Sequence, residues 1–362
     1  MATVLVGVLL LGMGAQFVGT ERGRNAMTTD LATLAATPTS GQRTLPIEIR
    51  GVHVTMGLAS LPGKLDEYLD LERDGLTALE LDVKDENGEI GFITRSVPRQ
   101  AVAIGAARDY YDPATVARRA DARGIYLIGR IVVFEDPVLS SARPDLAIRR
   151  SDGSVWRDAA GLGWTNPYDR RVWKYNVDVA IAAARAGFDE IMFDYVRFPS
   201  DGDVDRAVYA NRGSLAKREA IPAFLRYAKQ RLEPYDVRLA AAVFGLSAAR
   251  DLGIGQLPRR MAPYLDTVYA MTYPSLFGPG ELGLADPGAT PGATVQRALR
   301  RFELALRGRD ALLVPWVQDF SFTVPYGIDE VRAQVHAARL AGAKGFLLWN
   351  AEGLYTEGAL AP

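Results

Sequence analysis

Short apolar runs alternate with longer amphipathic stretches eight times along this chain. The apolar runs span Ile47–Gly57, Ala78–Lys84, Tyr126–Asp136, Glu190–Phe198, Arg238–Leu246, Thr267–Pro274, Leu312–Phe320 and Gly345–Asn350. Strand-like runs separated by helix-like stretches are typical of parallel sheets in which each crossover connection is a helix. The alternation therefore limits the chain to an α/β fold.

Helical patterns fill most of the intervals between these runs, over Leu65–Asp74, Pro113–Arg123, Arg171–Ala186, Leu215–Leu232, Thr294–Leu306 and Asp329–Ala341. Glycines follow four of them, where a helix C-cap glycine belongs, at Gly75, Gly124, Gly187 and Gly342. Eight repeats predict a single (β/α)8 TIM barrel over residues 47–362. An open doubly wound sheet is the alternative, but no glycine-rich phosphate loop follows the first run.

The N-terminal region differs in composition from the predicted barrel. Residues 4–18 are almost wholly apolar, which predicts a signal peptide or membrane anchor within residues 1–20. A buried N-terminal helix is the alternative. Residues 21–46 are rich in Thr, Ala, Ser and Gly and are expected to form a flexible linker. We expect an exported or membrane-anchored protein that faces the cell exterior or envelope.

Composition excludes several classes of site. The 362 residues carry a formal net charge of −1, which gives no support for nucleic-acid binding. There are no cysteines and only two histidines, so disulfides, thiolate metal sites and His-rich metal sites are excluded. We expect no cofactor. A Mg²⁺ site built from carboxylates alone is a weaker alternative.

Polar residues recur near the carboxyl ends of the predicted strands, where the active sites of barrels of this kind lie. Side-chain alternation places Leu79, Leu81 and Val83 toward the helices and Glu80, Asp82 and Lys84 toward the lumen. The same argument, applied to the other strands, predicts one rim lined by Asp82, Lys84, Asp136, Asp194, Tyr273 and Gln318. Arg130 shares a strand face with Asp136, and Arg130, Gln318 and Asp319 are expected to contact the substrate.

Paired carboxylates beside aromatic side chains suit glycoside hydrolysis. Asp194 ends an apolar strand and is the expected nucleophile or charge-stabilising carboxylate. Asp136 is the leading candidate for the general acid, with Asp82 and Asp319 as rivals. Arg197 and Lys84 are expected to hold carboxylates or bind substrate hydroxyls. Side chains expected to bind or stack on sugar are Trp164, Tyr168, Tyr273, Trp316 and Trp349.

Purely structural roles remain open for the same residues. Asp194 with Arg197, and Asp82 with Lys84, could each form an ion pair that only stabilises the barrel. Asp136 precedes a proline and could be a turn residue. His53 is expected to be a hydrogen-bonded lumen residue. Two alternative functions remain. The protein could be a carbohydrate-binding barrel without catalytic activity, or an aldolase-like enzyme in which Lys84 forms a Schiff base.

Between about residues 50 and 355 the chain resembles an uncharacterised bacterial family of predicted glycoside hydrolases. The resemblance lies in Leu81–Asp85, Arg130–Pro137, Trp164–Tyr168, Gly187–Ile191, Phe193–Pro199, Met271–Ser275, Pro315–Phe320 and Leu348–Ala351. It implies a TIM barrel that acts on carbohydrate, with Asp194 central, and adds Asn166 and Asn350 as substrate-binding candidates. Leu276 and Phe346 depart from the family pattern, which has His and Trp there.

Overall fold

Eight parallel strands close into a barrel in the computed structural model, which describes residues 44–322 and 324–362. The strands are β1 (Ile49–Val54), β2 (Ala78–Lys84), β3 (Tyr126–Val132), β4 (Glu190–Asp194), β5 (Arg238–Phe244), β6 (Thr267–Met271), β7 (Leu312–Gln318) and β8 (Gly345–Trp349). They follow one another around the barrel in chain order, and β8 pairs with β1. The predicted (β/α)8 fold is confirmed.

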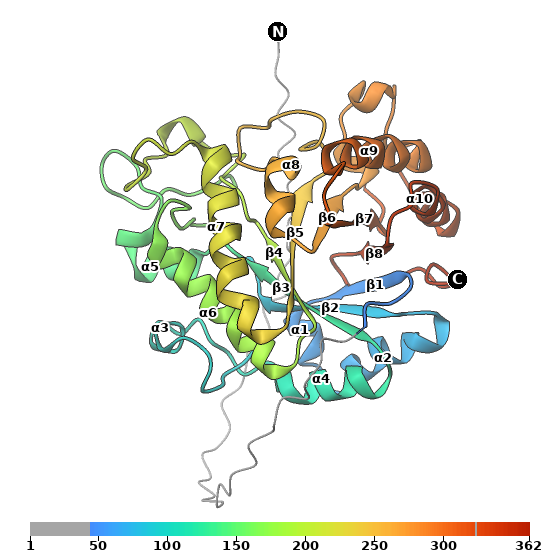
Figure 1. Ribbon diagram of the computed structural model, residues 1–362, viewed down its shortest axis with the longest axis horizontal. Helices are drawn as coiled ribbons and strands as arrows, with labels where there is room; N and C mark the ends of the chain where they lie inside the picture. The colour runs from blue at the N-terminus through green and yellow to red at the C-terminus, as the bar shows by residue number, and fades with distance from the viewer. Residues whose placement is uncertain (1–43, 323) are drawn as a thin grey trace, which may run out of the picture.

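Helices surround the strands (Figure 1). The α-helices are α1 (Met56–Ala59), α2 (Lys64–Asp70), α3 (Arg99–Ala103), α4 (Pro113–Ala122), α5 (Pro137–Ala142), α6 (Arg170–Ala186), α7 (Lys217–Leu232), α8 (Pro258–Met261), α9 (Pro291–Leu306) and α10 (Ile328–Leu340). Single turns of 3₁₀ helix are η1 (Leu71–Asp74), η2 (Pro144–Leu146), η3 (Val204–Arg206), η4 (Glu233–Tyr235), η5 (Ala262–Tyr264), η6 (Pro274–Leu276) and η7 (Glu281–Gly283). The six predicted helices are present, and the short α1, α3, α5 and α8 are additional.

Two apolar clusters divide the interior. The larger one packs between the strands and the helices and contains Leu79, Leu81 and Val83, as alternation predicts. The smaller one fills the lumen with Ile49, Ala78, Tyr126, Ile128, Met192, Ala240, Ala242, Tyr269, Tyr273, Val314, Trp316 and Leu347. Within this lumen, Glu190 accepts hydrogen bonds from Tyr269, Thr267 and Tyr126. The barrel is therefore a packed core, and the space for chemistry is at its rim.

The predicted N-terminal segments lie almost entirely outside the described residues. The export or anchor segment, residues 1–20, is not described, and of the linker only residues 44–46 are. Among residues 44–322 and 324–362, no helix combines the length and hydropathy that a membrane span needs.

Barrel closure depends on a glycine where β8 meets β1. Gly345 has φ +148° and is the register partner of Ile49. A Cβ at Gly345 would lie 1.9 Å from the Ile49 carbonyl oxygen and 2.5 Å from its amide nitrogen. Only glycine allows the two backbones to approach so closely.

Gly345→Ala should lower the free energy of unfolding by about 3 kcal/mol or more, because the strands must separate or the backbone must distort. Chemical denaturation followed by circular dichroism measures this loss. Gly57→Ala is the matched control, since its Cβ would meet only Thr55 Oγ1 at 3.9 Å. Equal stabilities of the two variants would contradict the role of Gly345.

Candidate active site

The guanidinium of Arg130 occupies the centre of a buried acidic cluster at the rim. Its Nη1 donates to Asp82 Oδ1 at 2.7 Å, and its Nε donates to Asp194 Oδ2 at 2.9 Å. Glu86 Oε2 lies 3.3 Å from Nη1, and Glu80 Oε1 lies 4.0 Å from Nε. Burial by itself would lower the pKa of Arg130, but these carboxylates, Asp82 first, raise the pKa well above its usual value.

The strand register explains this cluster. Asp82 on β2 is the register partner of Arg130 on β3, so the two side chains share the lumen face as neighbours. Asp194 is the last residue of β4, and its register partner is Val132 at the end of β3. The predicted rim position of Asp82 and Asp194 is therefore found, and Arg130 joins them.

Asp194 is held by two hydrogen bonds and an ion pair. Its Oδ2 accepts from Nε of Arg130 and lies 2.8 Å from Nη2 of the same guanidinium, and its Oδ1 accepts from the Tyr195 amide at 2.7 Å. Tyr195 has φ +46°, an uncommon conformation for a non-glycine residue. This turn aims the Tyr195 amide back at the carboxylate. A charged, acceptor-only carboxylate suits such a set of donors.

Glu135, three residues beyond the end of β3, has the opposite environment. The residue is 5% exposed, and its carboxyl group makes no hydrogen bond with another described residue. Burial raises the pKa of Glu135 to about 9, and the nearby charges of Asp158, Glu86 and Asp194 add to this effect, while Arg197 opposes it. Glu135 therefore carries a proton at neutral pH, which is the state required of a general acid.

Alternation predicts a rim position for Asp136. However, β3 ends at Val132, so alternation no longer fixes the direction of the side chains beyond it. Glu135 instead forms an isolated antiparallel β-bridge with Trp164. The signal that could have found it is the one used for Asp194, a carboxylate that directly follows an apolar run.

Asp136 and Lys84 form a buried ion pair outside the lumen. Lys84 Nζ lies 2.8 Å from Asp136 Oδ2 and also donates to Val132 O and to Asn176 Oδ1 on α6. Asp136 Oδ1 caps α5 by accepting from the Leu139 amide at 2.7 Å. Both side chains of the pair are wholly buried.

The expected lumen position of Lys84 is therefore wrong, and Asp136 does not join the acidic cluster. A register shift between Asp82 and Lys84 interrupts the alternation and turns Lys84 outward. A wholly enclosed, ion-paired lysine is also a poor candidate for a Schiff base, which needs access to the substrate.

Arg197 does not pair with Asp194. Its guanidinium packs against the rings of Phe244, Trp164 and Tyr195, at 4.7, 4.9 and 5.0 Å from their centroids. It donates to Phe198 O and Ser200 Oγ. The alternative of a structural Asp194–Arg197 ion pair is therefore wrong: Asp194 pairs with Arg130, and the carboxyl group on which the charge of Arg197 acts is that of Glu135.

Aromatic side chains form a wall on the β6–β8 side of the rim. The rings of Tyr273 and Trp316 are stacked with centroids 6.3 Å apart, and Trp349 lies 5.5 Å from Tyr273. Tyr273 Oη and Trp316 Nε1 are buried without a hydrogen-bond partner among the described residues. The charge of Asp194 contributes to a raised Tyr273 pKa, after the larger effect of burial. Both atoms belong to the packed lumen cluster and are shielded from solvent, so each is a buried polar group without a described partner.

Leu276 and Phe320 complete this wall. Leu276 packs against the lumen cluster, so the residue that departs from the family pattern adds apolar surface near the rim. Phe320 contacts Trp349 edge-on at 5.4 Å. The half-buried Trp349 is the most accessible ring of the three predicted wall residues.

Several predicted binding residues are engaged in internal contacts. Gln318 bonds to Ser275, Phe320 O and Gln334, and Asp319 accepts from Thr356. Asn350 donates to Asp319 O, Asn166 donates to Ala210 O, and Trp164 donates to Asp158. Trp164 is fully buried. These residues shape the loops around the rim, and the structure does not bring their polar groups to the acidic cluster.

His53 lies in the lumen, as expected. Its Nδ1 is 3.3 Å from Glu80 Oε2, and its Nε2 is 3.7 Å from Asp82 Oδ2. Burial alone would lower the pKa of His53, but Asp82 and Glu80 outweigh it and raise the pKa. Among the described residues, no group of three or more His, Cys, Asp or Glu side chains has the arrangement of a metal site.

Residues 51–355 match the model of a family described as "Putative glycosyl hydrolase domain". The chain belongs to this family. A comparison with curated proteins found no match. The family resemblance inferred from the sequence motifs is therefore confirmed.

Solved glycoside hydrolases share the fold. The glycoside hydrolase domain of PgaB (BpsB) from Bordetella bronchiseptica is 16% identical, with a TM-score of 0.61 over 84% of this chain and 94% of that one. The spore cortex-lytic enzyme SleL from Bacillus megaterium QM B1551 is 12% identical, with a TM-score of 0.53 over 89% of this chain and 74% of that one.

A hypothetical protein from Ruminiclostridium thermocellum ATCC 27405 is 34% identical over 52% of this chain and 96% of that one, with a TM-score of 0.48.

Lys84→Met should lower the free energy of unfolding by about 3–5 kcal/mol, because it leaves the Asp136 carboxylate buried without its partner. Chemical denaturation gives the value, and Asp136→Asn in the same chain should recover part of the loss. Lys174→Met is the control, since the Lys174–Asp178 pair is largely exposed and should contribute about 0–1 kcal/mol. A small loss at Lys84 would show that this pair is dispensable.

Glu135→Gln should become progressively more stable than the wild type as pH rises from about 4.5 to about 9. The raised pKa means that folded Glu135 keeps a proton that the unfolded chain releases, so wild-type stability falls across this window. The difference should grow by at most ~1.4 kcal/mol per pH unit. Denaturation at several pH values tests it, with exposed Glu303→Gln as the control. A difference that does not change with pH would refute the protonated Glu135.

Proposed function

We propose that this protein hydrolyses glycosidic bonds with Glu135 as general acid and Asp194 as the second carboxylate. The observation that carries the proposal is the contrast between two buried carboxyl groups on neighbouring strand ends. The Glu135 carboxyl group has no hydrogen-bond partner among the described residues and a pKa raised to about 9, whereas Asp194 accepts two hydrogen bonds and forms an ion pair with Arg130. Such a pair, one protonated and one charged, is what glycoside hydrolysis requires.

The roles follow from these environments. Glu135 would protonate the glycosidic oxygen as the bond breaks, and its proton is present up to about pH 9. Asp194, held in place by Arg130 and the Tyr195 amide, would face the positive charge that develops on the sugar ring. Because Arg130 also binds Asp82, it is fixed from two sides and positions Asp194. Asp82 itself would act through Arg130 and not on the substrate.

The aromatic wall would bind the sugar. Trp349 offers a half-exposed ring, and Tyr273 and Trp316 carry buried polar atoms without described partners beside Asp194. Ring stacking and hydrogen bonds to sugar hydroxyls are the contacts that such a wall provides. The expected substrate is a cell-envelope or extracellular polysaccharide. Membership of the family and the apolar residues 4–18, which predict export or anchoring, support this choice.

The test is product release from a panel of envelope and extracellular polysaccharides. Asp194→Asn and Glu135→Gln should each lower kcat by about 10²–10⁴-fold while the fold is kept, because each removes one catalytic carboxyl group. Glu303→Gln, an exposed residue on α9, should leave activity unchanged. Polysaccharide binding without release by the wild type would instead favour the silent carbohydrate-binding barrel.

An aryl glycoside with a strongly acidic phenol separates the two roles. Such a leaving group departs without protonation, so Glu135→Gln should regain much of its activity on it, whereas Asp194→Asn should not. Wild-type activity on the polysaccharide should fall above about pH 9, where Glu135 loses its proton. Equal defects of both variants on the activated substrate would remove the general-acid role from Glu135.

A further inference from the structure

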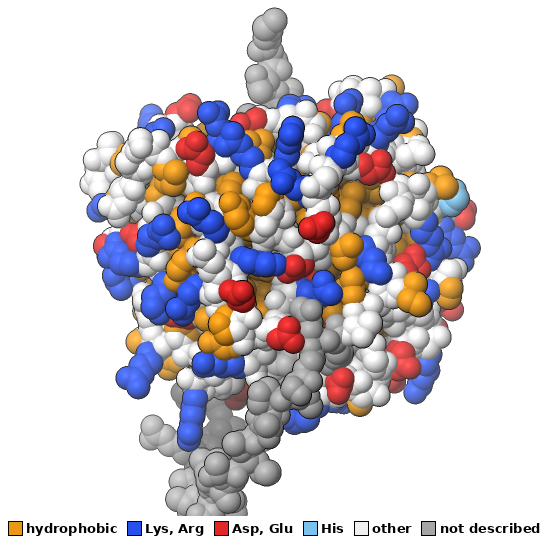
Figure 2. Space-filling view, viewed as in Figure 1, with side chains coloured by type: hydrophobic (Ala, Val, Ile, Leu, Met, Phe, Trp, Pro, Cys, Tyr) orange, Lys and Arg blue, Asp and Glu red, His pale blue; other side chains and the backbone are white. Residues whose placement is uncertain are grey.

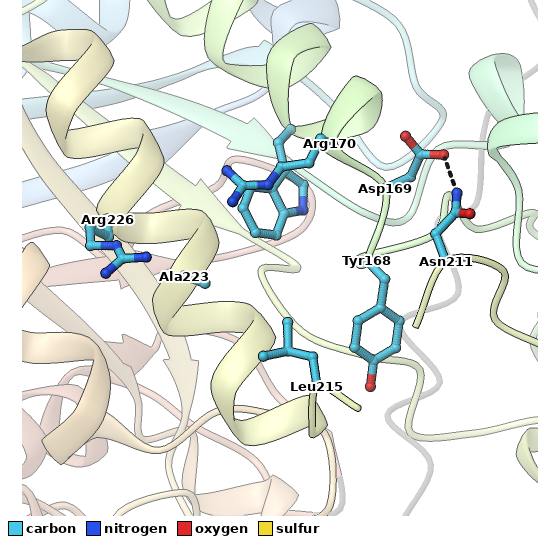
Figure 3. A pocket seen from close by; sticks show the side chains of 8 residues that line it. Tyr168, Asp169, Arg170, Asn211, Leu215, Ala223 and Arg226 are labelled. Carbon is cyan, nitrogen blue, oxygen red and sulfur yellow. Dashed lines mark hydrogen bonds between the residues drawn. The ribbon is translucent and has the colours of Figure 1, made fainter. Parts of the chain in front are cut away.

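A groove on the outer wall of the barrel is lined by exposed arginines. Two adjoining hollows, of about 500 and about 670 Å³, share Leu215, Ala223 and Arg226, and we call them together the α7 groove. The helix α7 packs against α6 and α8 here. Figure 3 shows the first hollow, with Arg170 and Arg226 coming from α6 and α7 and with Tyr168 and Asn211 across from them.

The positive charge in this groove is not neutralised by the described protein. The arginines that line it are Arg170, Arg218, Arg226, Arg259, Arg260 and Arg309. All six are exposed, and none forms an ion pair with a described carboxylate. Arg170 packs over the Trp173 ring at 4.4 Å, which fixes its guanidinium at the edge of the hollow. Figure 2 shows Lys and Arg side chains spread over the face that carries α7 and α8, with Asp and Glu side chains among them.

Among the described residues, two acidic side chains line the groove, and each already interacts with another group of the protein. Asp169 is bound by Arg171 at 2.7 Å, and Glu219 accepts from the Ala216 amide at the start of α7. Six arginines against two carboxylates leave a local charge of +4 on a chain whose net charge is −1. Like charges concentrated in a hollow raise the local potential and attract anions.

The groove begins where α6 and α7 start, at the end of the barrel that carries the carboxyl ends of the strands. Tyr168 and Asp169 belong to the segment that leads from β3 into α6, and Asn211 and Leu215 belong to the one that leads from β4 into α7. Glu135 and Asp194 lie at the starts of these same two segments. From there the lining follows one face of α7, at residues 218, 219, 222, 223 and 226, a spacing of three or four that marks a single helix face. A long polymer could lie along it with one end toward the rim.

We propose that the α7 groove binds an anionic polysaccharide, so that the substrate of the proposed glycosidase carries carboxylate or phosphate groups. Arginine guanidinium groups bind both kinds of anion with paired hydrogen bonds. The concave shape suits a strand of polymer. None of the exposed large hydrophobic side chains among the described residues lines the groove, so nothing there is suited to entering a bilayer. Naming the polymer as substrate rests on the proposed function, whereas its binding does not.

Binding of polygalacturonate to the full-length protein tests the proposal, by calorimetry at low and high salt. Wild type should bind it, and the triple variant Arg218→Glu, Arg226→Glu and Arg260→Glu should bind at least about tenfold more weakly. Wild-type binding should weaken as salt rises, because exposed charges are screened. Unchanged binding by the triple variant would overturn the proposal.

A matched control variant distinguishes the loss of groove arginines from the change in the net charge of the protein. Arg99→Glu, Arg118→Glu and Arg332→Glu remove the same charge from exposed arginines outside the groove. This variant should bind polygalacturonate within about twofold of the wild type, and an equal loss in both variants would refute a localised site. If the groove variant does not fold, the same three positions changed to Gln replace it, with melting temperature as the check.

Competing probes decide the class of ligand. A neutral glucan should not bind the groove, and tighter binding to phosphatidylglycerol vesicles or a single-stranded oligonucleotide than to polygalacturonate would contradict the proposal. Turnover is measured separately on the activated aryl glycoside. Turnover of the aryl glycoside without polyanion binding would refute only the proposal that the α7 groove binds a polyanion. Groove-dependent binding without turnover of any substrate would refute only the proposed glycosidase activity.

Discussion

The rim of this barrel depends on one buried cation. Arg130 lies among Asp82, Asp194, Glu86 and Glu80. Without it, Asp82, Asp194 and Glu80 would share a site with little solvent, in which His53 is the other described basic side chain within 4 Å of a carboxylate. An isolated buried charge costs several kcal/mol, so a cluster of this kind is tolerated only when its members are paired and hydrogen-bonded. Because the guanidinium is planar, it fixes where Asp82 and Asp194 lie relative to each other.

This pairing also accounts for the difference between the two proposed catalytic carboxyl groups. Asp194 lies within the strand register and therefore within reach of Arg130. Glu135 follows a strand that has already ended, and the cation near it, Arg197, is held by three aromatic rings and by Phe198 O. Arg197 lowers the pKa of Glu135 less than burial raises it. The same rim thus contains one carboxyl group that is paired with a buried guanidinium and one whose pKa is raised by burial.

The fold could be predicted from the sequence because apolar runs recur eight times, glycines follow four of the intervening helices, and neither signal needs knowledge of contacts. Side-chain direction was predictable only where a strand is regular. Leu79, Leu81 and Val83 face the helices as expected, but a register shift turns Lys84 outward, and β3 ends before Asp136. Tyr195, with its positive φ, likewise directs the chain after β4 away from the path that alternation assumes, and Arg197 lies beyond it. Local backbone irregularities of this kind leave no periodic signal in a single sequence.

The near-zero net charge of the chain conceals a separation of charge that bears on its ligand. Acidic groups gather in the lumen, where Glu80, Asp82, Asp194 and Glu190 are all nearly inaccessible to solvent, while unpaired arginines gather on the outer wall beside α7. A composition argument averages over both regions and therefore says little about anionic partners. A polymer approaching the protein meets the exposed surface first, and the arginines of the α7 groove are part of that surface, whereas the buried acids act only on what has reached the rim. The exposed arginines of the outer wall can thus attract an anionic polymer although the rim contains buried carboxyl groups. The two charged regions are separate and do not neutralise each other.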